Sequence, residues 1–97
     1  MTQLSGIPTL ASLEATHEFP CHYTLKAIGA NTDAFEAEAT RIAGEVSGYP
    51  ESLRVSRRLS GKGNHRAITL EVYVQSAHQV QALYTALFQV DGLKMML

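Results

Sequence analysis

The sequence predicts an α+β fold in which one four-stranded antiparallel sheet carries two helices on one face. Two segments, residues 19–29 and 66–74, alternate apolar and polar residues, which is typical of strands with one buried face. Two other segments, residues 35–46 and 80–87, place apolar residues at helical spacing. A chain of 97 residues can bury one core but not two, so these elements are expected to form one domain.

Residues 1–18 are expected to be a flexible or partly helical lead-in. A short helix is expected from Thr9 to Ala15, between Pro8 and Pro20. The first strand then begins at Phe19 and ends at Gly29, with its inward side chains at Phe19, Cys21, Tyr23, Leu25 and Ala27. Lys26 is therefore expected on the face away from the core.

The first long helix is predicted to begin at Asn31-Thr32-Asp33, where a side-chain oxygen can cap free backbone amides. Its apolar stripe consists of Phe35, Ala39, Ile42, Ala43 and Val46. Gly48, Tyr49 and Pro50 are expected to end it.

A hairpin is predicted between residues 53 and 74. Its first strand, residues 53–59, contains three arginines, which favours an edge position because charge discourages pairing with other chains. A glycine-rich turn over residues 60–65 leads into the second strand, whose inward positions are Ile68, Leu70, Val72 and Val74.

Ser76 and Gln79 form a Ser-x-x-Gln capping box that predicts the start of a second long helix. Its stripe is Val80, Leu83, Tyr84 and Leu87. Asp91-Gly92 breaks this helix, and residues 93–97 can form a short last strand. The element order is therefore β-α-β-β-α-β.

Two right-handed β-α-β crossovers that share a hairpin place the strands in the order 4-1-3-2, with both helices on one face. This is a ferredoxin-like sandwich, expected to span residues 19–97. Its other face stays open and is expected to carry Thr24, Lys26, Arg54, Ser56, Arg58, Thr69, Glu71, Tyr73 and Lys94, with Met96 as a further candidate. Lys26 and Glu71, on the two central strands, are expected to pair.

The order of short motifs resembles the YbeD-like proteins, a bacterial family of unknown function. The resemblance runs from about Glu18 to Leu97 and is carried by Phe19-Pro20-Cys21, Tyr23-Thr24-Leu25-Lys26, Gly29, Lys62-Gly63-Asn64 and Leu93-Lys94-Met95-Met96-Leu97. Family members are described as ferredoxin-like and similar to the regulatory ACT domains that bind small effectors. The resemblance therefore implies a regulatory role.

Composition excludes several classes of protein. The formal net charge of -1 gives no bulk attraction to nucleic acid or to anionic lipid, and no segment has the roughly 20 apolar residues of a membrane span. The one cysteine, Cys21, cannot form an internal disulfide, which together with the lack of a secretory signal favours the cytoplasm.

This sequence lacks the residues that known activities of ferredoxin-like folds require. The turn Gly29-Ala30-Asn31-Thr32 has no arginine for an acylphosphatase, and Cys21 has no second cysteine for a metallochaperone. Tyr73 is the single aromatic residue expected on the outer strands, whereas RNA recognition needs two or three. No nucleic acid, cofactor or catalytic residue is therefore expected.

The hairpin turn offers a second candidate site, for an anion, at Lys62, Gly63, Asn64, His65 and Arg66. In a P-loop the lysine stands at the start of a helix, whereas here a strand follows. The favoured interpretation is therefore that the glycines only allow the backbone to form the turn. The histidines, His17, His22, His65 and His78, lack metal-ligand spacing, so no metal is expected.

Two functions remain open. The first is a non-catalytic regulatory module that binds a small anionic metabolite or a protein partner at the open face or at a homodimer interface. Its site would comprise Lys26, Arg54, Arg58, Glu71, Tyr73 and Lys94. The alternative is a small enzyme or anion-binding site centred on Lys62–Arg66. The first is preferred because no second acid-base residue lies near the hairpin.

Overall fold

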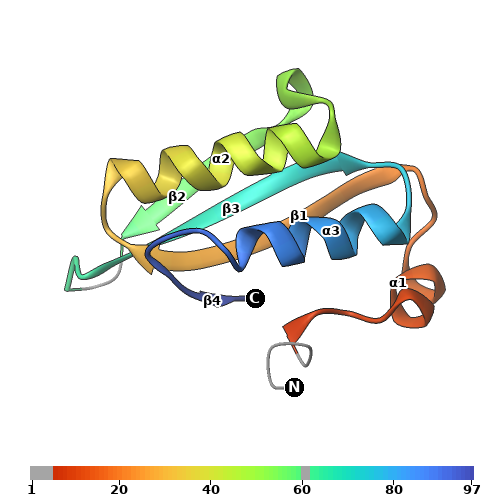
Figure 1. Ribbon diagram of the computed structural model, residues 1–97, viewed down its shortest axis with the longest axis horizontal. Helices are drawn as coiled ribbons and strands as arrows, with labels where there is room; N and C mark the ends of the chain where they lie inside the picture. Colours follow the sequence, from red (N-terminus) through yellow and green to blue (C-terminus); the bar gives the residue numbers. More distant parts are fainter. Residues whose placement is uncertain (1–5, 60–61) are drawn as a thin grey trace.

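The computed structural model describes residues 6–59 and 62–97 (Figure 1). In chain order its elements are α1 (Leu10–Thr16), β1 (Cys21–Ala30), α2 (Asp33–Ser47), the 3₁₀ helix η2 (Pro50–Ser52), β2 (Arg54–Leu59), β3 (His65–Val74), α3 (Ala77–Leu87) and β4 (Leu93–Met96). The short helix expected near Thr9 is α1. Ser60 and Gly61, which belong to the predicted turn, lie outside the described residues.

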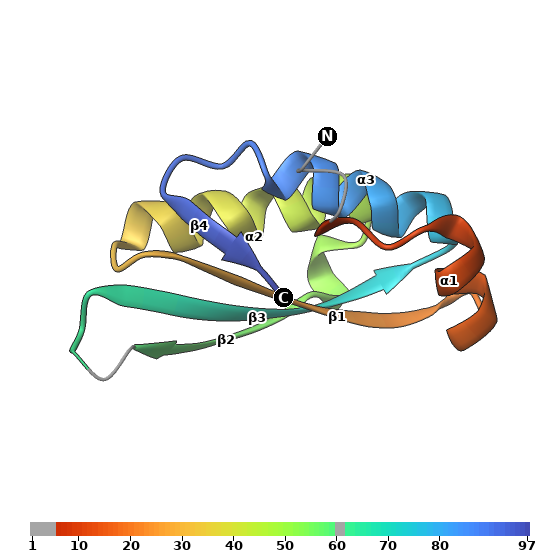
Figure 2. The ribbon, with the colours of Figure 1, turned by 90° about the horizontal axis from the view of Figure 1, so that it is seen from below.

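The four strands form one antiparallel sheet in the order β2-β3-β1-β4, which is 4-1-3-2 when counted from the other edge. Both α2 and α3 lie on the same side of this sheet (Figure 2). The α+β class and the antiparallel four-stranded sheet are thus confirmed. The arginine-rich strand β2 lies at the edge, as its charge predicts.

The core lies between the sheet and the helices and is formed by the inward positions that the two periodicities predict. The sheet contributes Leu25, Ala27, Ile68, Leu70, Val72 and Val74, and the helices contribute Phe35, Ala39, Ala43, Val80, Leu83 and Leu87, all at most 2% exposed. Burial of these apolar side chains is the main favourable term in folding.

Both long helices begin with a side-chain cap. The Thr32 hydroxyl accepts a hydrogen bond from the Phe35 amide (3.1 Å), and the Ser76 hydroxyl accepts one from the Gln79 amide (3.2 Å). These bonds satisfy amides that have no partner within the helix. The caps place the helix starts where the sequence predicts them.

The predicted outward position of Met96 is wrong. Met96 lies opposite Ala27, an inward residue, and packs against the core. The register between β1 and β4 shifts at Ile28/Gly29, which brings Met95 opposite Ile28 and leaves Met95 48% exposed. An irregularity of this kind changes which side chain faces the core, and the alternation of a four-residue strand cannot reveal it.

The predicted pairing of Lys26 with Glu71 is also wrong. The antiparallel register sets Lys26 opposite Thr69, and Glu71 opposite Thr24 on one side and Arg54 on the other. The Glu71 carboxylate lies 4.0 Å from Nε of Arg54. Glu71 is therefore associated with the edge strand.

The lead-in packs against the domain. Leu13 of α1 is 2% exposed and belongs to the core. The Gln81 side-chain amide on α3 donates a hydrogen bond to the Pro8 carbonyl (3.0 Å), and the His17 ring lies 5.1 Å from the Tyr23 ring. Residues 8–17 thus make contacts with both α3 and β1.

Candidate functional site

Figure 2 shows α2 and α3 on one side of the sheet. The outward positions of β1, β2 and β3 lie on the other side. The register brings together Lys26, Thr69 and Ser56 as a row across β1, β3 and β2. Arg58 lies two residues after Ser56 on β2, on the same face, opposite Ala67. Hydroxyls and cations are therefore neighbours at the centre of this face.

These residues surround a hollow of about 290 Å³ lined by Lys26, Ser56, Arg57, Arg58, Ala67 and Thr69. We call it the sheet-face hollow. Lys26 and Arg58 are exposed, and within the described part of the chain neither has a carboxylate partner. The hollow therefore holds two cationic side chains whose charges are not balanced locally.

Arg54 and Glu71 lie beside this hollow, around a smaller depression of about 160 Å³ that also includes Ser56 and Thr69. The Arg54 side chain is 82% exposed and its nearest carboxylate is that of Glu71 at 4.0 Å. The charge of Arg54 is thus partly offset, whereas the charges of Lys26 and Arg58 are not. Of the predicted cations, these two line the hollow and have no carboxylate partner among the described residues.

Tyr73 lies in an aromatic cluster at the other end of β3. Its ring centre is 5.3 Å from those of His22 and Tyr49. The Tyr49 hydroxyl accepts a hydrogen bond from the Gln75 side-chain amide (2.8 Å). Sequence reasoning missed Tyr49, which follows α2 and reaches β3 only through the tertiary fold.

Lys94 is not brought to the sheet-face hollow. It lines a separate depression of about 400 Å³ together with Ala30, Asn64, His65, Gly92 and Leu93. Lys94, predicted to lie with Lys26 on the open face, therefore lies beside residues of the predicted hairpin site. Lys62, at the hairpin, is exposed.

Arg66, predicted to belong to the hairpin site, instead directs its guanidinium toward the start of α2. Its Nη1 lies 3.2 Å from Asp33 and 2.8 Å from Glu36, and its Nε donates to the Asn31 side-chain oxygen (3.1 Å). The Arg66 side chain is 13% exposed. Its charge is therefore balanced inside the protein and does not add to the charge of the turn.

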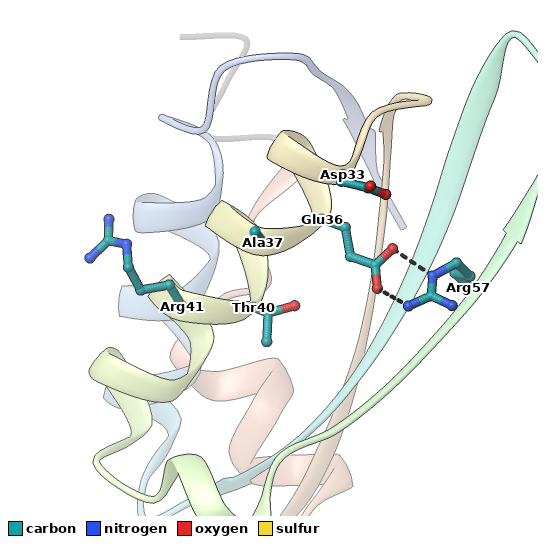
Figure 3. A pocket seen from close by; sticks show the side chains of 6 residues that line it. All are labelled: Asp33, Glu36, Ala37, Thr40, Arg41 and Arg57. Atoms are coloured by element: carbon teal, nitrogen blue, oxygen red, sulfur yellow. Dashed lines mark hydrogen bonds and ion pairs between the residues drawn. The ribbon is translucent and has the colours of Figure 1, made fainter.

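Glu36 joins two arginines on the helix side of the sheet. Arg57 donates from Nε (2.6 Å) and Nη2 (2.5 Å) to its two oxygens, a bidentate pair visible in Figure 3. Hydrogen bonds first from Arg57 and then from Arg66 hold the pKa of Glu36 below its usual value. We call Glu36, Arg57 and Arg66 the ion cluster.

The described residues contain no group of three metal-ligating side chains. Burial raises the pKa of the Cys21 thiol, and burial together with the Tyr23 hydroxyl raises the pKa of Tyr84. Both raised pKa values make these groups less suited to proton transfer at neutral pH.

The helices among residues 6–59 and 62–97 are all too short or too polar to cross a bilayer.

The fold and the hollow define a small α+β protein whose open sheet face presents a locally unbalanced cationic patch. Residues 14–97 match a family described as "Protein of unknown function (DUF493)". The chain belongs to this family, which is the YbeD-like family that the sequence motifs indicate.

Its bacterial relatives are named only as UPF0250 proteins. One from Shewanella woodyi is 38% identical over 81 residues, covering 82% of this chain and 89% of the relative. Another, from Pasteurella multocida, is 30% identical over 87 residues, covering 90% of this chain and 97% of the relative. These names assign no ligand, so the function must be argued from the site.

Proposed function

We propose that this protein is a non-catalytic regulatory module of the cytoplasm that binds a small anionic metabolite in the sheet-face hollow. The observation that carries the proposal is the placement of Lys26 and Arg58, both without a carboxylate partner among the described residues, beside the hydroxyls of Ser56 and Thr69.

The chemistry of the hollow suits a carboxylate or a phosphate. A guanidinium supplies two parallel N–H donors and an ammonium supplies a compact charge, while the two hydroxyls can donate further hydrogen bonds. The volume of about 290 Å³ lies just below the roughly 300–1,000 Å³ typical of ligand pockets, so the ligand is expected to be small.

A binding role is preferred over catalysis because of what lines the hollow. Lys26 is its one lining residue that can act as a general acid or base, and no histidine, cysteine or carboxylate lines it as a second such group. We also infer that the fold is ferredoxin-like and related to the ACT domains, since the order β1-α2-β2-β3-α3-β4 is that of a ferredoxin-like sandwich. Small-effector binding by such a fold supports a regulatory role by analogy only.

The test is a titration of ¹⁵N-labelled protein with a panel of di- and tricarboxylates, amino acids and phosphates at low salt. At least one of these ligands should shift the amide signals of Lys26, Ser56, Arg58 and Thr69 together. The double variant Lys26→Ala/Arg58→Ala should bind it roughly 2- to 30-fold more weakly, the sum of two exposed charge contacts, and added salt should weaken the wild type.

A matched double variant, Lys62→Ala/Lys94→Ala, removes the same charge from the hairpin and the adjoining depression. Unchanged affinity in this variant would support the sheet-face hollow. If it lost the affinity while Lys26→Ala/Arg58→Ala retained it, the hairpin alternative would replace the proposal. No shift at the hollow with any member of the panel would reject it.

A further inference from the structure

The free edge of β2 offers backbone hydrogen-bonding groups. The Lys26 amide and carbonyl exchange hydrogen bonds with Leu97 (3.3 and 2.8 Å), so the backbone of Lys26 points toward β4. Because backbone groups alternate in direction along an antiparallel strand, the partner of Lys26 on β3, Thr69, points toward β2 and pairs with Ser56. The backbones of Val55, Arg57 and Leu59 therefore face outward from the sheet.

This edge is accessible. Five of the six residues of β2 are exposed, Val55 being the half-buried one, and Leu59 is an apolar side chain that is 51% exposed. No backbone hydrogen bond outside the regular elements involves β2 among the described residues. Edges of this kind are templates for an added strand.

A groove runs along α2 beside this edge. Its first part, about 520 Å³, is lined by α2 and Arg57 and is shown in Figure 3. Its second part, about 440 Å³, includes Gly44, Pro50 and Leu53. Both parts are lined by Thr40 and Arg41, and we call them together the α2–β2 groove.

The charges on the two sides of β2 differ. On the groove side, Glu36 pairs with Arg57, and Arg41 pairs with Glu38 and Glu45, so both arginines there have carboxylate partners. On the open face, Arg58 has no carboxylate partner among the described residues and Arg54 has one only at 4.0 Å. A strand lying against β2 would meet paired arginines and apolar surface on one side, and arginines that are unpaired or only partly offset on the other.

We propose that the edge of β2 and the α2–β2 groove bind an extended segment of another protein in which acidic and apolar residues alternate. The backbone of the segment pairs with Val55, Arg57 and Leu59. Its acidic side chains lie beside Arg54 and Arg58, and its apolar side chains enter the groove, because alternate residues of a strand point to opposite faces. This surface adjoins the sheet-face hollow, because Arg57 and Arg58 border both.

A second copy of this chain fits the edge poorly in two of the antiparallel registers open to β2. Antiparallel self-pairing of β2 centred on Ser56 sets Arg54 opposite Arg58, and pairing centred on Arg57 sets Arg57 opposite itself. Like charges directly opposite each other destabilise a strand pair. The arginines of β2 therefore favour an occupant of opposite charge over a second copy in these registers.

The test uses the blocked octapeptide acetyl-(Glu-Val)₄-amide, with acetyl-(Lys-Val)₄-amide as the charge control. The acidic peptide should slow hydrogen exchange of the Val55 and Arg57 amides at least about tenfold at saturation and leave the β4 amides unchanged. The charge-reversed variant Arg54→Glu/Arg58→Glu should bind the acidic peptide roughly tenfold more weakly and should gain binding of the basic one.

Two further variants separate this surface from the hollow. Val55→Pro removes an outward amide that β3 does not use, so the strand can persist while peptide binding falls. Lys26→Ala should leave peptide affinity unchanged. The proposal is overturned if the acidic peptide does not bind, if it protects other amides, or if charge reversal does not exchange the preference between the two peptides.

Discussion

Glu36 on α2 forms ion pairs that connect this helix to the sheet. Its side chain is 13% exposed and accepts hydrogen bonds from Arg57 on β2 and Arg66 on β3. Both contacts join residues at least 21 positions apart in sequence. The ion cluster therefore stabilises tertiary structure rather than a single helix.

Replacement of Glu36 by Gln should lower the free energy of unfolding by about 1 kcal/mol, as measured by urea denaturation at pH 7. The amide retains the shape but loses the charge, and the figure is modest because Arg57 is 60% exposed and water screens it. Glu38→Gln, the same change at an exposed site on α2, is the control and should have a smaller effect. Equal losses would mean that the ion cluster adds no tertiary stability.

The contribution of Glu36 should depend on pH in a defined direction. Its pKa in the folded protein lies below the ordinary value of 4.5. The stabilisation is therefore fully present above that ordinary value and is lost as the pH falls through the lower, folded pKa. The difference in stability between wild type and Glu36→Gln should accordingly shrink between about pH 4.5 and the acid limit of folding.

Leu70 and Thr69 test the assignment of the two sheet faces. Leu70 is fully buried, so Leu70→Ala should cost about 2–5 kcal/mol of unfolding free energy through lost burial and the cavity left behind. Thr69→Ala on the open face should cost well under about 1 kcal/mol. Comparable losses at the two positions in thermal or urea unfolding would contradict the face assignment.

Single-residue periodicity predicted much of the core but only part of the site. It predicted that Leu70 faces inward and that Lys26 faces outward, because alternation depends on local geometry alone. It could not predict that Arg66 lies against Asp33 and Glu36, which are 33 and 30 residues away. It also could not predict that Lys94 lies beside the hairpin residues and not beside Lys26. That placement depends on the path of the chain between α3 and β4.

At the scale of elements, Gln79 connects the start of α3 to the end of α2. Its side-chain oxygen accepts a hydrogen bond from the Gln75 amide (2.7 Å), and its side-chain nitrogen donates to the carbonyls of Val46 (3.1 Å) and Ser47 (3.3 Å). The Ser-x-x-Gln pattern predicted the helix start because capping is local. The bonds to α2 could not be read from that motif.

Two substitutions at Gln79 separate these roles. Gln79→Glu retains an acceptor for the Gln75 amide but removes the donor and sets a carboxylate against the Val46 and Ser47 carbonyls. It should therefore destabilise the protein by about 1–3 kcal/mol, whereas Ser76→Ala, which removes only a cap, should cost about 1 kcal/mol. Hydrogen exchange at the end of α2 should accelerate in Gln79→Glu and not in Ser76→Ala. Unchanged exchange at α2 would show that the two helix ends are not coupled through Gln79.

At the scale of the whole molecule, the sequence predicted the element order because each helix and strand has its own periodicity and end signals. It placed the structured domain at residues 19–97 because residues 1–18 have no strong period. In the structure, however, α1 contributes Leu13 to the common core and Pro8 contacts α3. A seven-residue helix with one buried residue has no periodicity to detect, so this packing is a property of the folded molecule only.

The last prediction tests whether α1 is part of the cooperative unit. Leu13 is 2% exposed, so Leu13→Ala should cost about 2–5 kcal/mol, whereas Ser12→Ala, at an exposed position of the same helix, should cost well under about 1 kcal/mol. The loss should appear as an earlier single transition, with fluorescence of the tyrosines and far-ultraviolet circular dichroism changing together, because Leu13 shares its core with both α3 and the sheet. An unchanged midpoint in Leu13→Ala, or a separate early transition confined to α1, would show that residues 19–97 fold independently of the lead-in.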